Sequence, residues 1–390
     1  MIIQWTNISD NMNEDTRKNI EHAIDESGFP FENFASTKLR DHGWTIIPNR
    51  FYLDDIKGIE REIDILAYKY YLDKKEKICY YTGLIISCKK SIKNKWCFLT
   101  RDSNNNDINV NYFPFHFLTD DEILKYMTYS EMTSIEKKYK ADKQIKELFS
   151  FPKSIISYQI LNEKSFNKNE QIYDSIVTSI KALESEKSNL LKKRSGLKKN
   201  YKLYYSFYLL SLFDGEMIDC NFDPNGNVVY SDINTFLYLN RHIVNKEENF
   251  YSVHFIKKDV IDKELARYDA LATLNFQIFS NFIDAFYTDI FKSEEKVKLI
   301  WDSFVEKTSQ AISYAVSKTI SQDVEIKLYT YKYENNVLTL DIGWYDNLNT
   351  YKVYEILNDP KTYAYSKVKS NLKDLFRYTG DFVFGDVLPF

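Results

Sequence analysis

The sequence predicts a mixed α/β fold, with an N-terminal α/β domain followed by an α+β region. Helical periodicity near the start gives way to three strand-like runs separated by charged turns, and a further helix and strand lie downstream. The 31 Tyr and 27 Phe supply enough apolar surface for a core. At 390 residues, the chain is long enough for two or three domains.

Two helices open the chain. Residues 13–26 have helical composition, and a second helix is expected from residue 31 to about 41, with Gly43 as its C-cap. Three strands follow, and the last is an apolar run typical of a buried central strand. They are expected at residues 44–53, 62–71 and 78–88.

The downstream elements suggest how the chain divides. A capping box at Thr119-Asp120-Asp121-Glu122 opens one helix. Further elements are expected as a helix at 141–149, a strand at 154–161 and a long helix at 169–193. We expect a domain over residues 1–165, a helical connector over 166–200 and an α+β accessory domain over 201–390. The accessory domain would hold strands over 201–256, helices over 261–320, and strands with a short helix over 324–390.

The composition argues against several classes of function. None of the ten Gly forms a GxGxxG pattern or precedes a Lys-Ser or Lys-Thr pair, so dinucleotide and P-loop sites are not expected. The four cysteines form no CxxC pair, which argues against structural zinc and fits a reducing cytoplasm. We expect a cytoplasmic protein without a signal peptide or membrane partner. The formal net charge of −4 gives no global nucleic-acid footprint but allows local basic patches.

One region places carboxylates where they can meet a lysine. Residues i and i+2 of a strand share a face, so Glu62 and Asp64 point the same way. Ser87 and Lys89 do the same in the next strand, and Glu32 can join them from the neighbouring helix. Mg²⁺ is commonly held by one or two carboxylates with substrate phosphate and water. A nearby lysine can orient or activate water and neutralise phosphate charge. Phosphodiester hydrolysis requires these groups.

Four short segments occur in order across these elements. They are Gly28-Phe29-Pro30-Phe31-Glu32, Asp41-His42-Gly43-Trp44, Arg61-Glu62-Ile63-Asp64-Ile65 and Ile86-Ser87-Cys88-Lys89-Lys90. Together they resemble the PD-(D/E)XK nuclease superfamily, and in pattern its bacterial restriction-endonuclease-like members. Trp96 is similar to a tryptophan often seen after the third strand. The resemblance covers residues 28–101, extended to 161 by the later helix and strand. It implies an αβββαβ nuclease domain and a role in bacterial defence against foreign DNA.

The resemblance implies roles for individual residues. Asp64 would be the metal-binding aspartate and Lys89 the catalytic lysine. Glu32 would be the first-helix glutamate that supports the metal. The backbone carbonyl of Cys88 would be an additional ligand.

The chain departs from the family at Ser87, where the family usually has Glu or Asp. Glu62 would replace the missing carboxylate as a metal ligand. The alternative is a catalytically degenerate nuclease fold that acts as a nucleic-acid-binding or assembly module.

The implied cofactor is Mg²⁺, with Mn²⁺ as a substitute, and the implied partner is DNA. No acidic residue occurs from Lys77 to Arg101. A solvated basic loop is the simple interpretation, and phosphate contact is the functional one. The candidate DNA-binding residues are Lys90, Lys93, Lys95 and Arg101. A third hypothesis, motivated by the helices over 261–320, is a structural or partner-binding protein. Further expected partners are a second copy of this chain, as a homo-oligomer, or another protein of a defence system.

Overall fold

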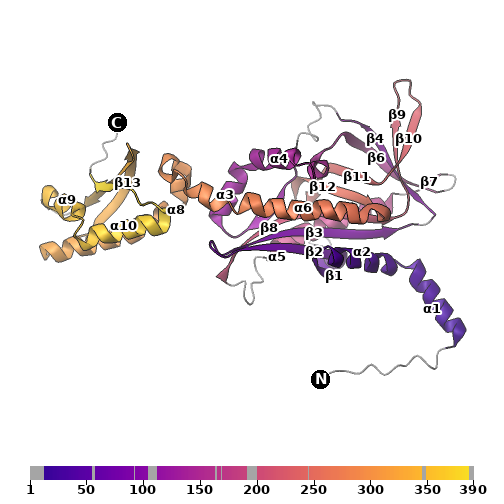
Figure 1. Cartoon of the computed structure of the whole chain (residues 1–390), viewed down its shortest axis with the longest axis horizontal. Helices are drawn as coiled ribbons and strands as arrows, with labels where there is room; N and C mark the ends of the chain where they lie inside the picture. Colours follow the sequence, from indigo (N-terminus) through magenta and orange to yellow (C-terminus); the bar gives the residue numbers. More distant parts are fainter. Residues whose placement is uncertain are drawn as a thin grey trace. The chain divides into compact units, whose positions relative to one another are not determined.

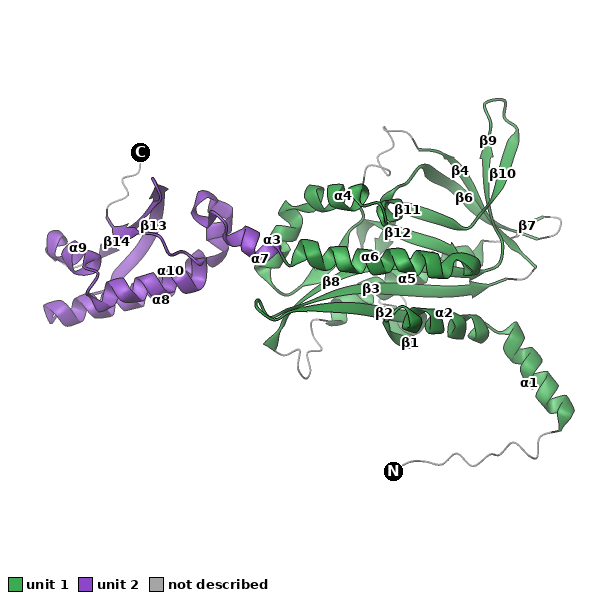
Figure 2. Ribbon diagram, in the orientation of Figure 1, with its two compact units in different colours: residues 1–280 green, residues 281–390 purple. Residues whose placement is uncertain are grey.

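Figure 1 shows the protein as a computed structural model of the whole chain. The expected mixed α/β class is confirmed, because helices accompany mixed sheets. The chain divides into two compact units, residues 1–280 and 281–390 (Figure 2). The structure describes residues 13–54, 58–91, 93–103, 112–162, 165–167, 169–190, 200–244, 246–344 and 348–385.

A mixed sheet forms the centre of unit 1 (Figure 1). In spatial order its strands are β1 (Thr45–Asp54), β2 (Ile59–Asp73), β3 (Ile78–Lys90), β8 (Lys202–Asp214), β12 (Glu247–Lys257) and β11 (Thr235–Val244). The first three strands form an antiparallel meander, and the short strand β5 (His116–Thr119) pairs with β8 off the main path. β8 runs parallel to β3, and β12 runs parallel to β8. The carboxyl ends of β3, β8 and β12 therefore lie at one edge of the sheet.

Helices pack on both faces of this sheet. They are α2 (Phe29–Asp41), α5 (Glu170–Leu190) and α6 (Ile261–Phe279), with the 3₁₀ turn η4 (Lys258–Val260) before α6. The first helix, α1 (Glu14–Glu26), contacts α2 and buries none of its residues. Consecutive residues of β3 show the two faces. The hydroxyl of Tyr80 donates to the carbonyl of Phe279 at the end of α6, whereas Tyr81 belongs to the core cluster that includes the buried side of α5.

The order α2-β1-β2-β3-α5-β8 gives the expected sequence of a helix, three strands, a helix and a strand. Its last two members are α5 and β8, however, and not the helix and strand expected at 141–149 and 154–161. A helix ends at Ala141, because Asp142 has extended backbone and its carboxylate accepts from the N–H groups of Gln144 and Ile145. Such local side-chain bonds compete with helix continuation.

The residues inserted between β3 and α5 contribute most of a second sheet, ordered β10-β9-β4-β6-β7. Its strands are β4 (Lys95–Asp102), β6 (Lys153–Leu161), β7 (Phe166–Asn167), β9 (Met217–Phe222) and β10 (Val228–Ile233). The insertion also holds the helices α3 (Glu122–Ser130) and α4 (Met132–Ala141) and the 3₁₀ turn η2 (Lys146–Phe149). Asp121 caps α3 by accepting from the N–H of Leu124.

The boundaries expected at residues 165 and 200 differ from those of the compact units. β8 was expected to open the accessory domain, yet it pairs with β3 along its whole length, from Ile78 opposite Lys202 to Lys90 opposite Asp214. Parallel pairing joins segments that are far apart in sequence, so composition along the chain does not show it. The long helix expected to reach residue 193 is described as far as Leu190, and residues 191–199 lie outside the described part.

Unit 2 packs helices against a three-stranded sheet. Its strands are β13 (Ile326–Glu334), β14 (Val337–Trp344) and β15 (Phe382–Phe384). Its helices are α7 (Phe282–Tyr287), η5 (Ile290–Lys292), α8 (Glu294–Ile320), α9 (Thr350–Asn358) and α10 (Tyr363–Phe376). Asn335 and Asn336 both have positive φ in the β13–β14 hairpin, which suits a tight turn. Within the described residues, no helix combines the length and apolarity needed to cross a membrane.

Candidate active site at the carboxyl edge of the central sheet

The structure brings Asp64 and Lys89 together. Asp64 lies in the first half of β2 and Lys89 near the end of β3, and these strands are antiparallel neighbours. The ammonium Nζ of Lys89 is 3.8 Å from Oδ2 of Asp64. The backbone N–H of Cys88 donates to the same oxygen at 2.5 Å. Both charged side chains keep partial access to solvent, 27% for Lys89 and 20% for Asp64. The pair is thus fixed by the strands yet open to a substrate.

Glu32 and Glu62 lie within electrostatic range of this pair. α2 carries Glu32 in its first turn, where the helix dipole favours a carboxylate. Burial raises the pKa of Glu32, and the negative charges of Asp64 and Glu62 raise it further, whereas Lys89 lowers it. A side chain at Gly28 would begin only 3.0 Å from Oε1 of Glu32, so the glycine leaves room for this carboxylate. Glu32 therefore senses two neighbouring carboxylates, those of Asp64 and Glu62, and the ammonium of Lys89.

Strand alternation is interrupted beside Asp64. Ile63 and Leu66 both belong to the core cluster on the α5 face, although a regular strand would place residues three apart on opposite faces. Asn49 of β1, which lies opposite Asp64, has φ of +49° and is skipped in the pairing between the strands. Alternation is therefore interrupted between Ile63 and Leu66. This irregularity was not visible in the sequence.

Ser87 is fully buried, and within the described residues its Oγ has no hydrogen-bond partner. It pairs in register with Ser211 of β8, whose hydroxyl donates to Ser175 of α5. Among the described residues, Ser87 makes no hydrogen bond to Asp64. Position 87 thus holds a small, buried hydroxyl in place of the carboxylate that the resemblance would lead one to expect.

The donor chemistry of the site fits a divalent cation held in part by the substrate. In the part of the chain that the structure describes, no three carboxylate, imidazole or thiol groups gather closely enough to hold a metal ion. Asp64 with Glu62 or Glu32 would therefore supply one or two oxygens, and water and phosphate the rest, as is common for Mg²⁺. Burial, with the charges of Asp64 and Glu32, raises the pKa of the Cys88 thiol well above its usual range. Cys88 could thus contribute only its backbone carbonyl.

Two further lysines lie at the same edge: Lys257 ends β12, and Lys258 begins the turn η4 that follows it. Nζ of Lys258 is 2.9 Å from Oδ2 of Asp214, and Nζ of Lys257 is 3.0 Å from Oε2 of Glu216. The ammonium of Lys258 also lies 5.4 Å from the centre of the Phe34 ring. Neither lysine was predicted to be part of the site, although the sequence shows an apolar strand that ends in a Lys-Lys pair. β8 lies between β3 and β12, so their place at this edge depends on two parallel pairings that the sequence did not reveal.

The expected DNA contacts divide into two groups. Lys90, Lys93 and Lys95 lie within six residues of Lys89, and Lys93 and Lys95 are exposed. Arg101 is also exposed but lies six residues beyond Lys95 along β4, about 20 Å away. The structure therefore brings the three lysines to the end of β3 and places Arg101 apart.

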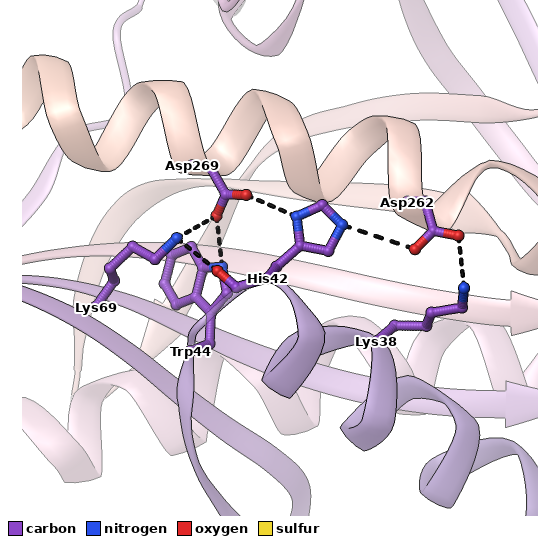
Figure 3. A network of polar contacts seen from close by, with 6 residues as sticks. All are labelled: Lys38, His42, Trp44, Lys69, Asp262 and Asp269. Carbon is purple, nitrogen blue, oxygen red and sulfur yellow. Dashed lines mark hydrogen bonds and ion pairs between the residues drawn. The ribbon is translucent and has the colours of Figure 1, made fainter.

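A polar network anchors α2 and β1 to α6, and we call it the α2–α6 clamp (Figure 3). Its centre is Asp269 of α6. One carboxylate oxygen accepts from Nε1 of Trp44 at 2.8 Å and from Nζ of Lys69 at 2.6 Å, and the other lies 2.6 Å from Nδ1 of His42. Lys69 also donates to the backbone carbonyl of His42 at 2.7 Å. The clamp fixes the end of the helix that carries Glu32.

The outer part of the clamp is more exposed. Asp262, two turns before Asp269, pairs with Nζ of Lys38 at 2.7 Å and lies 3.6 Å from Nε2 of His42. The Asp262 side chain is 59% exposed, against 28% for Asp269. The inner aspartate is therefore the stronger anchor.

Comparisons with protein-family models, curated proteins and solved structures return no match.

Proposed function

We propose that this chain is a metal-dependent deoxyribonuclease that hydrolyses phosphodiester bonds, with a role in bacterial defence against foreign DNA. The contact between Asp64 and Lys89 is the observation that carries the proposal. It lies at the end of β3 within a helix, three-strand, helix, strand order, with Glu32 and Glu62 in electrostatic range. The lysine, the carboxylates and the order of elements together support a nuclease more directly than the short sequence segments around Asp64 or Lys89 do alone.

Each side chain has a separate task in this proposal. A bound Mg²⁺ would polarise a phosphoryl oxygen and lower the pKa of a coordinated water. Asp64, with Glu62 or Glu32, supplies the hard oxygens that hold the cation. Lys89 places its positive charge beside the phosphate and orients the attacking water. One P–O bond forms to the water oxygen and the bond to the leaving ester oxygen breaks; the attacking water gives a proton to solvent, and the leaving oxygen takes one from solvent to become a hydroxyl.

Cleavage of supercoiled plasmid DNA by the purified chain tests the proposal. We expect cleavage with Mg²⁺ or Mn²⁺ and none in EDTA. Lys89→Ala and Asp64→Asn should each lower the rate at least about 100-fold, as expected for groups that act at the reacting phosphate. Lys125→Ala, on exposed α3, is the matched control and should cleave like the wild type. Absence of cleavage by the wild type with either metal would refute the proposal, as would full activity in Lys89→Ala.

A degenerate nuclease fold that only binds nucleic acid is the second candidate. The buried Ser87 in place of a carboxylate favours it, together with the absence of a three-ligand group among the described residues. Salt-sensitive DNA binding without metal-dependent cleavage would support this candidate. Ser87→Glu separates the two: a gain of cleavage or metal affinity favours degeneracy. Loss of an existing activity, in a variant shown to fold, favours a working site.

A further inference from the structure

We propose that Cys97 and Cys220 form a redox-sensitive thiol pair, which a hydroperoxide converts into a reversible disulfide between β4 and β9. These two strands are parallel neighbours in the second sheet (Figure 1). Both cysteines carry free thiols in this structure. Neither is a member of the candidate active site, so the proposal does not depend on the proposed nuclease activity.

The register of β4 and β9 brings the two thiols to one face of the second sheet. Cys97 lies opposite Ile218, and Cys220 lies opposite Leu99. Residues two apart on a strand share a face, so Cys97 and Cys220 are diagonal neighbours on the same face. The thiol of Cys97 donates a hydrogen bond to the sulfur of Cys220. The sulfurs therefore already face each other, and a disulfide needs only a small further approach.

The two cysteines differ in their access to solvent. Cys97 is buried, with 5% of its surface exposed, whereas Cys220 is partly exposed. Cys220 lies opposite Tyr230 of the edge strand β10, and this tyrosine is 74% exposed. A small oxidant in solution can therefore reach Cys220 first, while Cys97 stays shielded.

The hydrogen bond between the thiols gives each sulfur a separate task. Burial raises the pKa of both thiols, and the neighbouring Cys220 helps to raise that of Cys97 to about 12. Accepting the bond from Cys97 lowers the pKa of Cys220, which partly offsets the effect of burial. The thiolate is the form that attacks a peroxide, so Cys220 reacts first. The reaction is slow, because the pKa of Cys220 remains raised.

The oxidation runs in two steps. The thiolate of Cys220 attacks a hydroperoxide and the O–O bond breaks; Cys220 becomes a sulfenic acid, and the released oxygen takes the thiol proton to become an alcohol or water. The sulfur of Cys97 then attacks that of Cys220, an S–S bond forms, and the displaced hydroxyl leaves as water with the proton of Cys97. Two thiols are oxidised in total, and one hydroperoxide is reduced.

The position of the pair makes the disulfide reversible. A diagonal pair lies near the upper limit of the Cα separation that a disulfide spans, so closing the bond strains the two strands. Strained disulfides are readily reduced, and a thiol reductant restores the resting pair. Because β4 follows β3 and β9 follows β8, the bond would join the two segments that leave the carboxyl edge of the central sheet.

Peptide mapping of the full chain tests the proposal. The protein is treated with hydrogen peroxide over a time course, the remaining thiols are alkylated under denaturing conditions, and a non-reducing digest is analysed by mass spectrometry. We expect a peptide pair that is cross-linked between Cys97 and Cys220, with the loss of two alkylatable thiols. Dithiothreitol should restore both thiols. Cys97→Ser should instead leave Cys220 as a sulfenic acid that dimedone labels, because the second thiol is missing.

The matched control is Cys79→Ala, which removes a buried thiol of β3 in the other sheet. This variant should form the cross-link between Cys97 and Cys220 as the wild type does. Treated wild-type protein that keeps both thiols alkylatable overturns the proposal. A disulfide through Cys79 or Cys88, or one between two copies of the chain, overturns it as well. Oxidation of Cys220 to a sulfinic acid without a bond to Cys97 does the same.

Discussion

Replacing Asp269 with alanine should destabilise unit 1 more than any single change in the outer clamp. The substitution leaves the N–H of Trp44, which is 3% exposed, and the ammonium of Lys69 without their acceptor. Breaking a fully buried charged pair costs about 3–5 kcal/mol. Asp269 is 28% exposed and Lys69 is 19% exposed, so solvent recovers part of this cost. We therefore expect a loss of about 2–3 kcal/mol in the free energy of unfolding.

The neighbouring aspartate supplies the comparison. Asp262→Ala removes an ion pair from the same helix, but its carboxylate is 59% exposed, so the expected loss is about 0–1 kcal/mol. Urea unfolding should be followed by hydrogen exchange of residues 261–279, which reports on unit 1 separately from unit 2. Equal losses for Asp269→Ala and Asp262→Ala would refute the reasoning. A loss below about 1 kcal/mol for Asp269→Ala would do the same.

Three further predictions concern the edge of the central sheet. Burial and neighbouring carboxylates raise the pKa of Glu32, so the folded state loses stability as pH rises from the unfolded pKa to the folded pKa. Glu32→Gln should therefore raise the Tm measured in EDTA at pH 7. At acid pH, where Glu32 is protonated, the same substitution should give no gain. An equal Tm at pH 7 would contradict this. Lys258→Ala should weaken DNA binding at low salt and reduce the slope of log affinity against log salt concentration by about one. Filter binding across a salt series measures this slope. An unchanged slope would show that Lys258 makes no phosphate contact. Ser87→Ala removes a buried hydroxyl that has no hydrogen-bond partner among the described residues. In urea titrations the free energy of unfolding should stay unchanged or rise by up to about 1 kcal/mol. A clear loss of stability would reveal a partner of Ser87.

Local signals in the sequence were sufficient for the elements that carry the candidate site. Helical spacing and Gly43, which has φ of +77°, marked the end of α2, and apolar runs between charged turns marked β1, β2 and β3. Because an antiparallel meander joins sequence neighbours, the approach of Asp64 to Lys89 could be predicted from strand positions.

Features that depend on long-range pairing could not be predicted. The sequence did not show that β8 joins β3, so it also missed Lys258 beside the site. Alternation is interrupted between Ile63 and Leu66, across from Asn49 with its positive φ, and the sequence of neither strand reveals this. The α2–α6 clamp likewise joins Asp269 to residues 200 or more positions away. Its members look like ordinary surface charges until α6 is placed beside them.

The pairing of β3 with β8 also affects how this chain folds. β3 ends at Lys90, whereas β8 ends at Asp214, so during synthesis an apolar strand waits for a partner more than 100 residues downstream. Until then its free edge exposes unpaired backbone groups, the kind of surface on which aggregation begins. Folding of the sheet should accordingly be slow, because contacts between distant segments carry a large loop-closure cost. A fragment that ends at residue 165 would keep Asp64 and Lys89. It would lack β8, the strand that pairs with the free edge of β3, and so would leave the strand that carries Lys89 without its second neighbour.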